Sequence, residues 1–106
     1  MLFRSDALGA TVLLKGNVTV IADPGGPVYL NPAGQSWAAT AGSGDLLSGM
    51  IGALLAAGLP PSEAAAAAAF VHARAAELSA ADPGPGYAPT SASRIVGHIR
   101  TALAAL

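Results

Sequence analysis

The stretch from Pro60 to about residue 81 constrains the fold more than any other part of this sequence. Two prolines and the acidic Glu63 open it, which is typical of the first turn of a helix. Strong helix formers follow, and the tract over residues 64–69 consists only of alanine. Because such a helix presents side chains no larger than a methyl group, we expect it to pack closely against a neighbouring element.

Short β-branched runs with glycine and proline turns between them precede this helix and predict a sheet. Residues 11–15 form a continuous apolar run that ends in a charge, which suits a strand buried on both faces, as in a parallel sheet. Residues 18–22 form a second strand-like run. A strong turn at residues 23–26 separates this run from a third strand at residues 28–30, which predicts a β-hairpin.

Two further helices are predicted, one on each side of the alanine-rich stretch. The first covers residues 45–57, and Gly58 is the expected residue at its end. The second covers residues 90–106, where apolar side chains follow helical spacing after a cap at Thr90 or Ser91. The order of elements indicates the α/β class, with a sheet fragment that contains a β-hairpin, followed by three helices.

The chain is rich in hydrophobic residues and poor in charged ones, so part of its surface must be apolar unless another structure covers it. Hydrophobic residues make up 53% of the 106 positions and charged residues only 10%, well below the roughly 25% of ordinary soluble domains. A small domain this apolar has too much exposed surface to remain a monomer. Either the chain forms a homo-oligomer, or it is a piece of a larger α/β domain whose other half covers these faces.

Charge and hydropathy also limit the partners. The net charge is −1 and there is no basic run, so we expect neither nucleic acid nor an anionic membrane to bind. The longest apolar stretch, residues 46–59, is shorter than the roughly 18 residues of a membrane span. The chain has no cysteine, which rules out disulfides and thiolate metal sites and fits a reducing cytosol, so we expect a cytoplasmic protein.

The clearest chemical signal is a glycine-rich loop directly before an apolar helix. It consists of Ala41, Gly42, Ser43 and Gly44, followed by Asp45. The first amides of a helix have no intrahelical acceptor, and glycines let an anion approach them. The loop therefore predicts an anion hole for the terminal phosphate of a nucleotide and for the charge that develops during phosphoryl transfer.

Asp45 needs a reason to lie in such a site, because a carboxylate alone would repel a bound phosphate. If it faces a substrate hydroxyl, it can accept that proton while the oxygen attacks phosphorus, which is general-base catalysis. The alternative is that Asp45 or Ser43 only caps the helix, since both residue types are preferred N-caps.

Other polar and aromatic residues carry weaker signals. Lys15 lies at the end of a predicted strand, where ligands of open α/β sheets bind, and lysine commonly contacts phosphate. Alternatively, the side chain of Lys15 only extends its charge into solvent. His72 fits a packed or partly exposed helix position better, and Trp37 and Tyr29 fit packing roles. Neither His72 nor His98 has a second ligand at metal spacing, so we assign no residue as a metal ligand.

The motifs occur in an order that is typical of one known family. Residues 15–19 (Lys-Gly-Asn-Val-Thr), 31–34 (Asn-Pro-Ala-Gly) and 39–49 (Ala-Thr-Ala-Gly-Ser-Gly-Asp-Leu-Leu-Ser-Gly) resemble the C-terminal half of the ADP/ATP-dependent NAD(P)H-hydrate dehydratases. That family is ribokinase-like, and the resemblance runs over residues 11–106. It implies that residues 1–106 are the C-terminal part of a single ribokinase-like domain whose N-terminal part is missing.

The resemblance also implies a reaction and its site residues. Enzymes of the family are lyases of metabolite repair: they use a phosphoryl group of ADP or ATP to remove water from hydrated NADH or NADPH. By motif, Asp45 would contact the hydrated cofactor and act as the base, and Mg²⁺ would accompany the nucleotide phosphates. The residues that would contact the nucleotide are Lys15, Gly16, Asn17, Val18, Thr19 and Gly44.

Two alternatives remain open at this point. A ribokinase-like small-molecule kinase, such as one acting on a vitamin alcohol, would use the same Asp45 but leave a stable phosphate ester. An inactive nucleotide-binding fragment or assembly module would keep the loop without turnover, and the short length of the chain favours it. ADP and ATP both stay open as the co-substrate.

Overall fold

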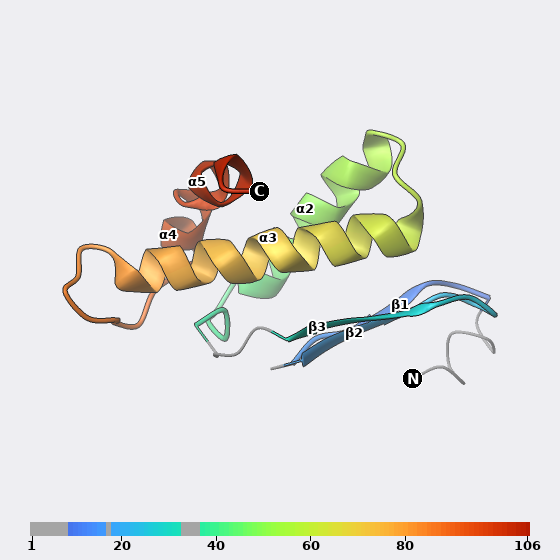
Figure 1. Ribbon diagram of the computed structural model, residues 1–106, viewed down its shortest axis with the longest axis horizontal. Helices are drawn as coiled ribbons and strands as arrows, with labels where there is room; N and C mark the ends of the chain where they lie inside the picture. Colours follow the sequence, from blue (N-terminus) through green and yellow to red (C-terminus); the bar gives the residue numbers. More distant parts are fainter. Residues whose placement is uncertain (1–8, 17, 33–36) are drawn as a thin grey trace.

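The computed structural model describes residues 9–16, 18–32 and 37–106 (Figure 1). Three strands, β1 (Val12–Leu14), β2 (Val18–Ala22) and β3 (Val28–Pro32), form a sheet in that order, with both pairs antiparallel. Between β2 and β3 the amide of Gly26 donates to the carbonyl oxygen of Asp23 at 3.2 Å, which closes a β-turn. The predicted hairpin is confirmed.

The first strand differs from its prediction in direction and in burial. Residues 11–15 are expected in a parallel sheet and buried on both faces, whereas β1 is shorter and pairs antiparallel with β2. Residues 15–17 alone connect the two strands, and a parallel pair needs a crossover of about a dozen residues or more. Leu14 is 59% exposed, so the described residues leave one face of this strand uncovered at its end.

The two faces of the sheet have different surroundings. Directly paired residues of antiparallel strands share a face. Thr19 and Ile21 of β2 are buried on the face toward helix α3 (Pro61–Ala81). On the opposite face, which we call the exposed sheet face, Val20 pairs with both Leu14 and Leu30, and Leu30 is 65% exposed.

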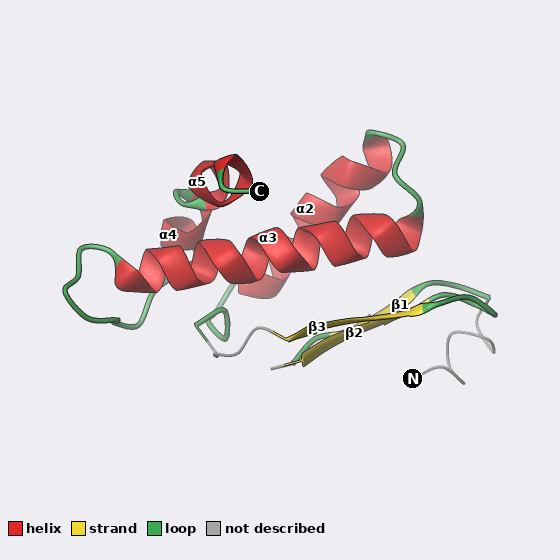
Figure 2. Cartoon of the chain, in the orientation of Figure 1, coloured by secondary structure: helices red, strands yellow, loops and turns green. Residues whose placement is uncertain are grey.

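Four helices follow the sheet in the described part of the chain: α2 (Ser43–Ala56), α3, α4 (Ala92–Val96) and α5 (Ile99–Ala104) (Figure 2). α2 ends at the predicted glycine. Gly58 takes a φ of +98°, and the amide of Leu59 donates to the carbonyl oxygen of Leu54 at 3.1 Å. This is the hydrogen-bond pattern of a helix C-terminus with a left-handed residue.

The last predicted helix occupies its expected stretch but is divided in two at Gly97 and His98. Ser91 caps its first half, where the Ser91 hydroxyl accepts a hydrogen bond from the amide of Arg94 at 3.4 Å. Glycine is a weak helix former, so the helix is interrupted where its continuation would contribute least to stability. The change of direction allows Ile95 and Ala102, one from each half, to be buried against α3.

α3 is the middle layer of the molecule, with the sheet on one side and α2, α4 and α5 on the other (Figure 1). Ala68 and Ala69 form a cluster with Leu47 of α2, against which Leu13 of β1 also packs, while Ala75 and Ala76 lie in a second cluster with Ile95 of α4. The predicted close packing of the alanine-rich helix is therefore confirmed. Among the residues that the structure describes, no helix has both the length and the apolarity needed to cross a membrane.

Candidate functional site

The glycine-rich loop turns into α2 at Gly42. This residue is the N-cap, has a φ of +84° and carries no side-chain cap. The amide of Ser43 donates to the carbonyl oxygen of Thr40 at 3.1 Å, and the amide of Leu46 donates to that of Gly42 at 3.1 Å. The helix thus begins two residues earlier than the predicted start at Asp45, and Gly44 belongs to its first turn.

Asp45 is the third residue of α2 and its side chain is exposed. Within the described residues its carboxylate has no hydrogen-bond or ion-pair partner. The alternative that Asp45 or Ser43 caps the helix is wrong, because the N-cap is Gly42 and no side chain caps it. The carboxylate is therefore available for another role.

The amides at the start of α2 are also accessible. Among the described residues, no backbone carbonyl accepts a hydrogen bond from the amides of Gly44 and Asp45. A Cβ atom built on Gly44 would meet no atom within 4 Å, so the space beside this backbone is open. Two outward-facing amides at the positive end of a helix can stabilise an anion.

His72 of α3 contacts this loop from the buried side, and the sequence did not indicate this contact. Its Nε2 lies 2.8 Å from Oγ of Ser43 and 3.1 Å from the carbonyl oxygen of Ser43. Both residues are buried. The signal that could have indicated the contact is a histidine on a helix of alanines, since a buried polar side chain must have a hydrogen-bond partner.

Lys15 lies in the same region. Burial lowers the pKa of His72 most, and the positive charge of Lys15 lowers it further, so the ammonium group acts electrostatically on the side chain that contacts the loop. Partial burial in turn lowers the pKa of Lys15. The ammonium group of Lys15 is thus close enough to act on His72, which contacts the start of α2.

The other predicted nucleotide contacts differ in exposure. Gly16 and Val18 are exposed, while Thr19 is 6% exposed on the face toward α3. Asn17 lies outside the described residues, as do Ala33 and Gly34 of the Asn-Pro-Ala-Gly motif.

The segment before the loop is attached to the connection between α3 and α4. The Thr40 hydroxyl donates to the carbonyl oxygen of Thr90 at 3.4 Å, and the Thr90 hydroxyl contacts that of Ser79. The rings of Trp37 and Tyr87 stack with centroids 5.7 Å apart and an interplanar angle of 9°. Trp37 is thus a packing residue, as predicted. Tyr29 is half-buried and pairs with the buried Ile21.

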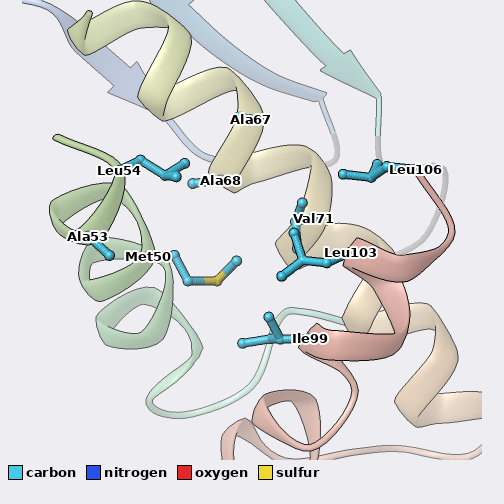
Figure 3. Close-up of a pocket in the computed structure, with 9 residues that line it drawn as sticks. All are labelled: Met50, Ala53, Leu54, Ala67, Ala68, Val71, Ile99, Leu103 and Leu106. Carbon is cyan, nitrogen blue, oxygen red and sulfur yellow. The ribbon is translucent and has the colours of Figure 1, made fainter. Parts of the chain in front are cut away.

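An apolar cavity of about 360 Å³ lies elsewhere, between α2, α3 and α5, with Met50, Val71 and Leu103 in its lining (Figure 3). None of the predicted site residues lines it, and neither does any titratable side chain. Among the described residues, no three histidine or acidic side chains are close enough together to hold a metal ion. The predicted site residues therefore lie away from this cavity.

Comparison with known proteins gives a consistent result. The family described as NAD(P)H-hydrate dehydratase matches residues 4–98. A bifunctional NAD(P)H-hydrate repair enzyme Nnr from Mycobacterium leprae is 89% identical over 102 residues, and one from Mycobacterium tuberculosis (strain H37Rv) is 88% identical over the same length. Each alignment covers 96% of this chain and 22% of the relative, so the chain spans about one fifth of these proteins.

A more distant relative carries a narrower name. The ADP-dependent (S)-NAD(P)H-hydrate dehydratase from Neisseria meningitidis is 53% identical over 70 residues, which cover 66% of this chain and 24% of that protein. No solved structure matches this chain.

Proposed function

Because this chain belongs to the NAD(P)H-hydrate dehydratase family, which is ribokinase-like, we propose that it carries the phosphoryl-transfer site of an ADP-dependent lyase. This enzyme would convert hydrated NADH or NADPH back to the reduced cofactor. One observation carries the proposal: the exposed carboxylate of Asp45 has no partner among the described residues and lies beside the free amides that open α2. A base and an anion hole next to each other are what phosphoryl transfer to a hydroxyl requires.

In the proposed reaction the hydroxyl of the hydrated nicotinamide ring attacks the terminal phosphorus of ADP. Asp45 accepts the hydroxyl proton while the new O–P bond forms and the bond from phosphorus to the oxygen of AMP breaks. The amides of Gly44 and Asp45 stabilise the charge on the phosphoryl oxygens. Phosphate then leaves the ring with the C–O electron pair, a ring proton is lost, and the double bond of the reduced cofactor is restored.

Residues 15–19 form the segment that we propose to lie against the nucleotide. Lys15 supports this assignment, since its charge acts on His72 next to the loop. A lysine ammonium can neutralise phosphate oxygens as a compact cation. Thr19 is buried on the α3 side of the sheet, so we propose that it positions this segment by packing against the core. Gly16 and Val18 are exposed.

We propose that the chain is the C-terminal part of its domain and that preceding residues complete the site. The exposed sheet face supports this, because Leu14 and Leu30 are 59% and 65% exposed and apolar surface of this kind favours a covering partner. Preceding segments of the same domain, or a second copy of the chain, would provide the cover.

The co-substrate in the proposal is ADP, after the names of the relatives from Neisseria meningitidis and Bacillus subtilis. Mg²⁺ would enter with the phosphates of the nucleotide. The described side chains do not fit a separate magnesium site, so no step is assigned to a protein-bound metal. We place the reaction in the cytoplasm.

The test replaces Asp45 by asparagine in a chimera, in which this chain substitutes for the aligned segment of the 88% identical Mycobacterium tuberculosis relative. The unsubstituted chimera should convert hydrated NADH to NADH with release of AMP and phosphate. Asp45→Asn should lower kcat at least about 100-fold, because the base is lost, while the Kd for ADP changes little. The measurements are NADH absorbance, phosphate release and calorimetric titration with ADP.

Three outcomes would contradict the proposal. A phosphorylated hydrate that accumulates without release of phosphate would identify a kinase. Nucleotide binding without any turnover by the unsubstituted chimera would identify an inactive binding module. Turnover of Asp45→Asn at the rate of the unsubstituted chimera would remove Asp45 as the base.

A further inference from the structure

We propose that His72 is a positioning residue that orients the first peptide of α2, and with it the amide of Gly44, toward the transferred phosphoryl group. The inference rests on the proposed function. It concerns a residue on α3 that does not itself reach the nucleotide, since His72 is 2% exposed and lies behind Ser43.

The contacts of His72 bear on which of its two ring nitrogens carries the proton. Its Nε2 lies within hydrogen-bond distance of two oxygens of Ser43, the hydroxyl at 2.8 Å and the backbone carbonyl at 3.1 Å. A carbonyl oxygen only accepts hydrogen bonds. An unprotonated Nε2 would place its lone pair against that oxygen, so the geometry favours the tautomer with the proton on Nε2, whose N–H group donates to the carbonyl oxygen and also lies close to the hydroxyl.

This hydrogen bond has a direct consequence for the next residue. A trans peptide unit is planar, and its C=O and N–H groups point in opposite directions. Holding the carbonyl oxygen of Ser43 therefore also fixes the direction of the Gly44 N–H. That amide is one of the two at the start of α2 without a backbone acceptor among the described residues.

The loop needs such support because its own sequence is flexible. Ser43 lies between Gly42 and Gly44, and glycine permits far more backbone conformations than other residues. No side chain caps the helix. The first turn of α2 sets the general direction of these amides, and the contact from His72 restrains the Ser43–Gly44 peptide further.

α3 is suited to hold them. The residues one turn before and after His72 on the same face, Ala68, Ala69, Ala75 and Ala76, are all buried. Residues three and four apart share a helix face, so the imidazole projects from the most closely packed stripe of the longest helix. Burial, and after it the charge of Lys15, lower the pKa of His72, which favours the neutral imidazole as the donor beside the anion hole.

The test compares four variants in the chimera. His72→Leu and His72→Asn should lower kcat about 10- to 100-fold, less than the roughly 100- to 1,000-fold of an anion-hole donor that is removed outright, with a smaller change in the KM for ADP. His72→Gln should recover kcat to within about threefold, because its amide nitrogen reaches the position of Nε2 whereas that of asparagine falls one carbon short. His98→Leu, the control at the other histidine, should leave kcat unchanged.

A purely structural role of His72 predicts a different pattern. The loss of kcat would then follow the loss of Tm in all variants, and glutamine and asparagine at position 72 would not differ in the way that their side-chain lengths predict. If glutamine and asparagine give equal kcat, or if His72→Leu is folded and as active as the unsubstituted chimera, the inference is wrong. Should the unsubstituted chimera bind ADP without turnover, the proposed function fails, and the ADP affinities of the glutamine and asparagine variants test the inference instead. Equal affinities would overturn it, and so would the absence of ADP binding.

Discussion

At the scale of single residues, the site depends on two side chains of one helical turn that face opposite ways. Successive residues of an α-helix are about 100° apart, so Ser43 and Asp45 point in nearly opposite directions from the axis of α2. Ser43 is fully buried against His72, whereas Asp45 is exposed. The same turn of helix therefore provides both an attachment to the core and a free carboxylate.

The burial of His72 predicts a dependence of stability on pH. Burial and the charge of Lys15 lower the pKa of His72 below its ordinary value of 6.5, so the unfolded chain takes up the proton first as the pH falls. The stabilisation is fully present above about pH 6.5 and is lost as the pH falls through the folded-state pKa. Urea unfolding of the chimera between about pH 5 and 8 should show this loss, and His72→Gln should remove it.

Asp23 provides the contrast within the same measurement. The hydroxyls of Ser62 and Thr11 lower its pKa below 3.8, so its contribution to stability is lost only as the pH falls below that value. A loss of stability between about pH 6.5 and 5 that is the same with glutamine at position 72 would contradict the assignment to His72.

At the scale of elements, the start of α2 combines a requirement for glycine with an absence of side-chain caps. Gly42 has a φ of +84°, in the left-handed region that residues with a Cβ rarely adopt. A Cβ atom there would also lie 3.4 Å from that of Ala92 in α4. The glycine is needed for the direction in which the loop enters the helix.

Substitution at two glycines of this region should have opposite effects. Gly42→Ala should lower the free energy of unfolding by about 1–2 kcal/mol because of the strained φ. Gly52→Ala, inside α2 with no atom within 4 Å of an added Cβ, should raise it by about 0.5–1 kcal/mol because alanine is the better helix former. Urea unfolding measures both values. A stabilising Gly42→Ala would show that the loop does not need the left-handed conformation.

At the scale of the whole molecule, the layers are complete on one side only. α3 covers one face of the sheet and is itself covered by α2, α4 and α5 (Figure 1). The exposed sheet face, with Leu14, Val20 and Leu30 in one row across the strands, has no element on it in the described part of the chain. An apolar face without cover in the described residues agrees with the low proportion of charged residues.

The exposed sheet face predicts self-association of the isolated chain. Removing apolar surface from water is favourable by roughly 25 cal/mol per Å², and this face is the most exposed apolar part of the sheet. Leu30→Glu should shift the chain toward the monomer in sedimentation velocity experiments. Leu55→Glu, at a position that is 43% exposed on α2, is the matched control and should have no such effect. Equal behaviour of the two variants would show that association uses another surface.

Much of this structure follows from local signals in the sequence. Turn residues predict the hairpin, Gly58 ends α2, and prolines begin α3, because each depends on the backbone preferences of a few adjacent residues. The glycine-rich loop and the position of Asp45 at the start of a helix are predictable for the same reason. The sequence by itself therefore determines where most elements lie and which carboxylate lies at the start of α2.

The tertiary structure alone decided the relations between distant residues. The pairing direction of β1 depends on a partner strand, and the break at Gly97 and His98 depends on burial against α3. The contact of His72 with Ser43 joins residues 29 positions apart. A histidine has the same local preferences whether it only fills space or is bonded to the glycine-rich loop, so only the packing of α3 against α2 distinguishes the two cases.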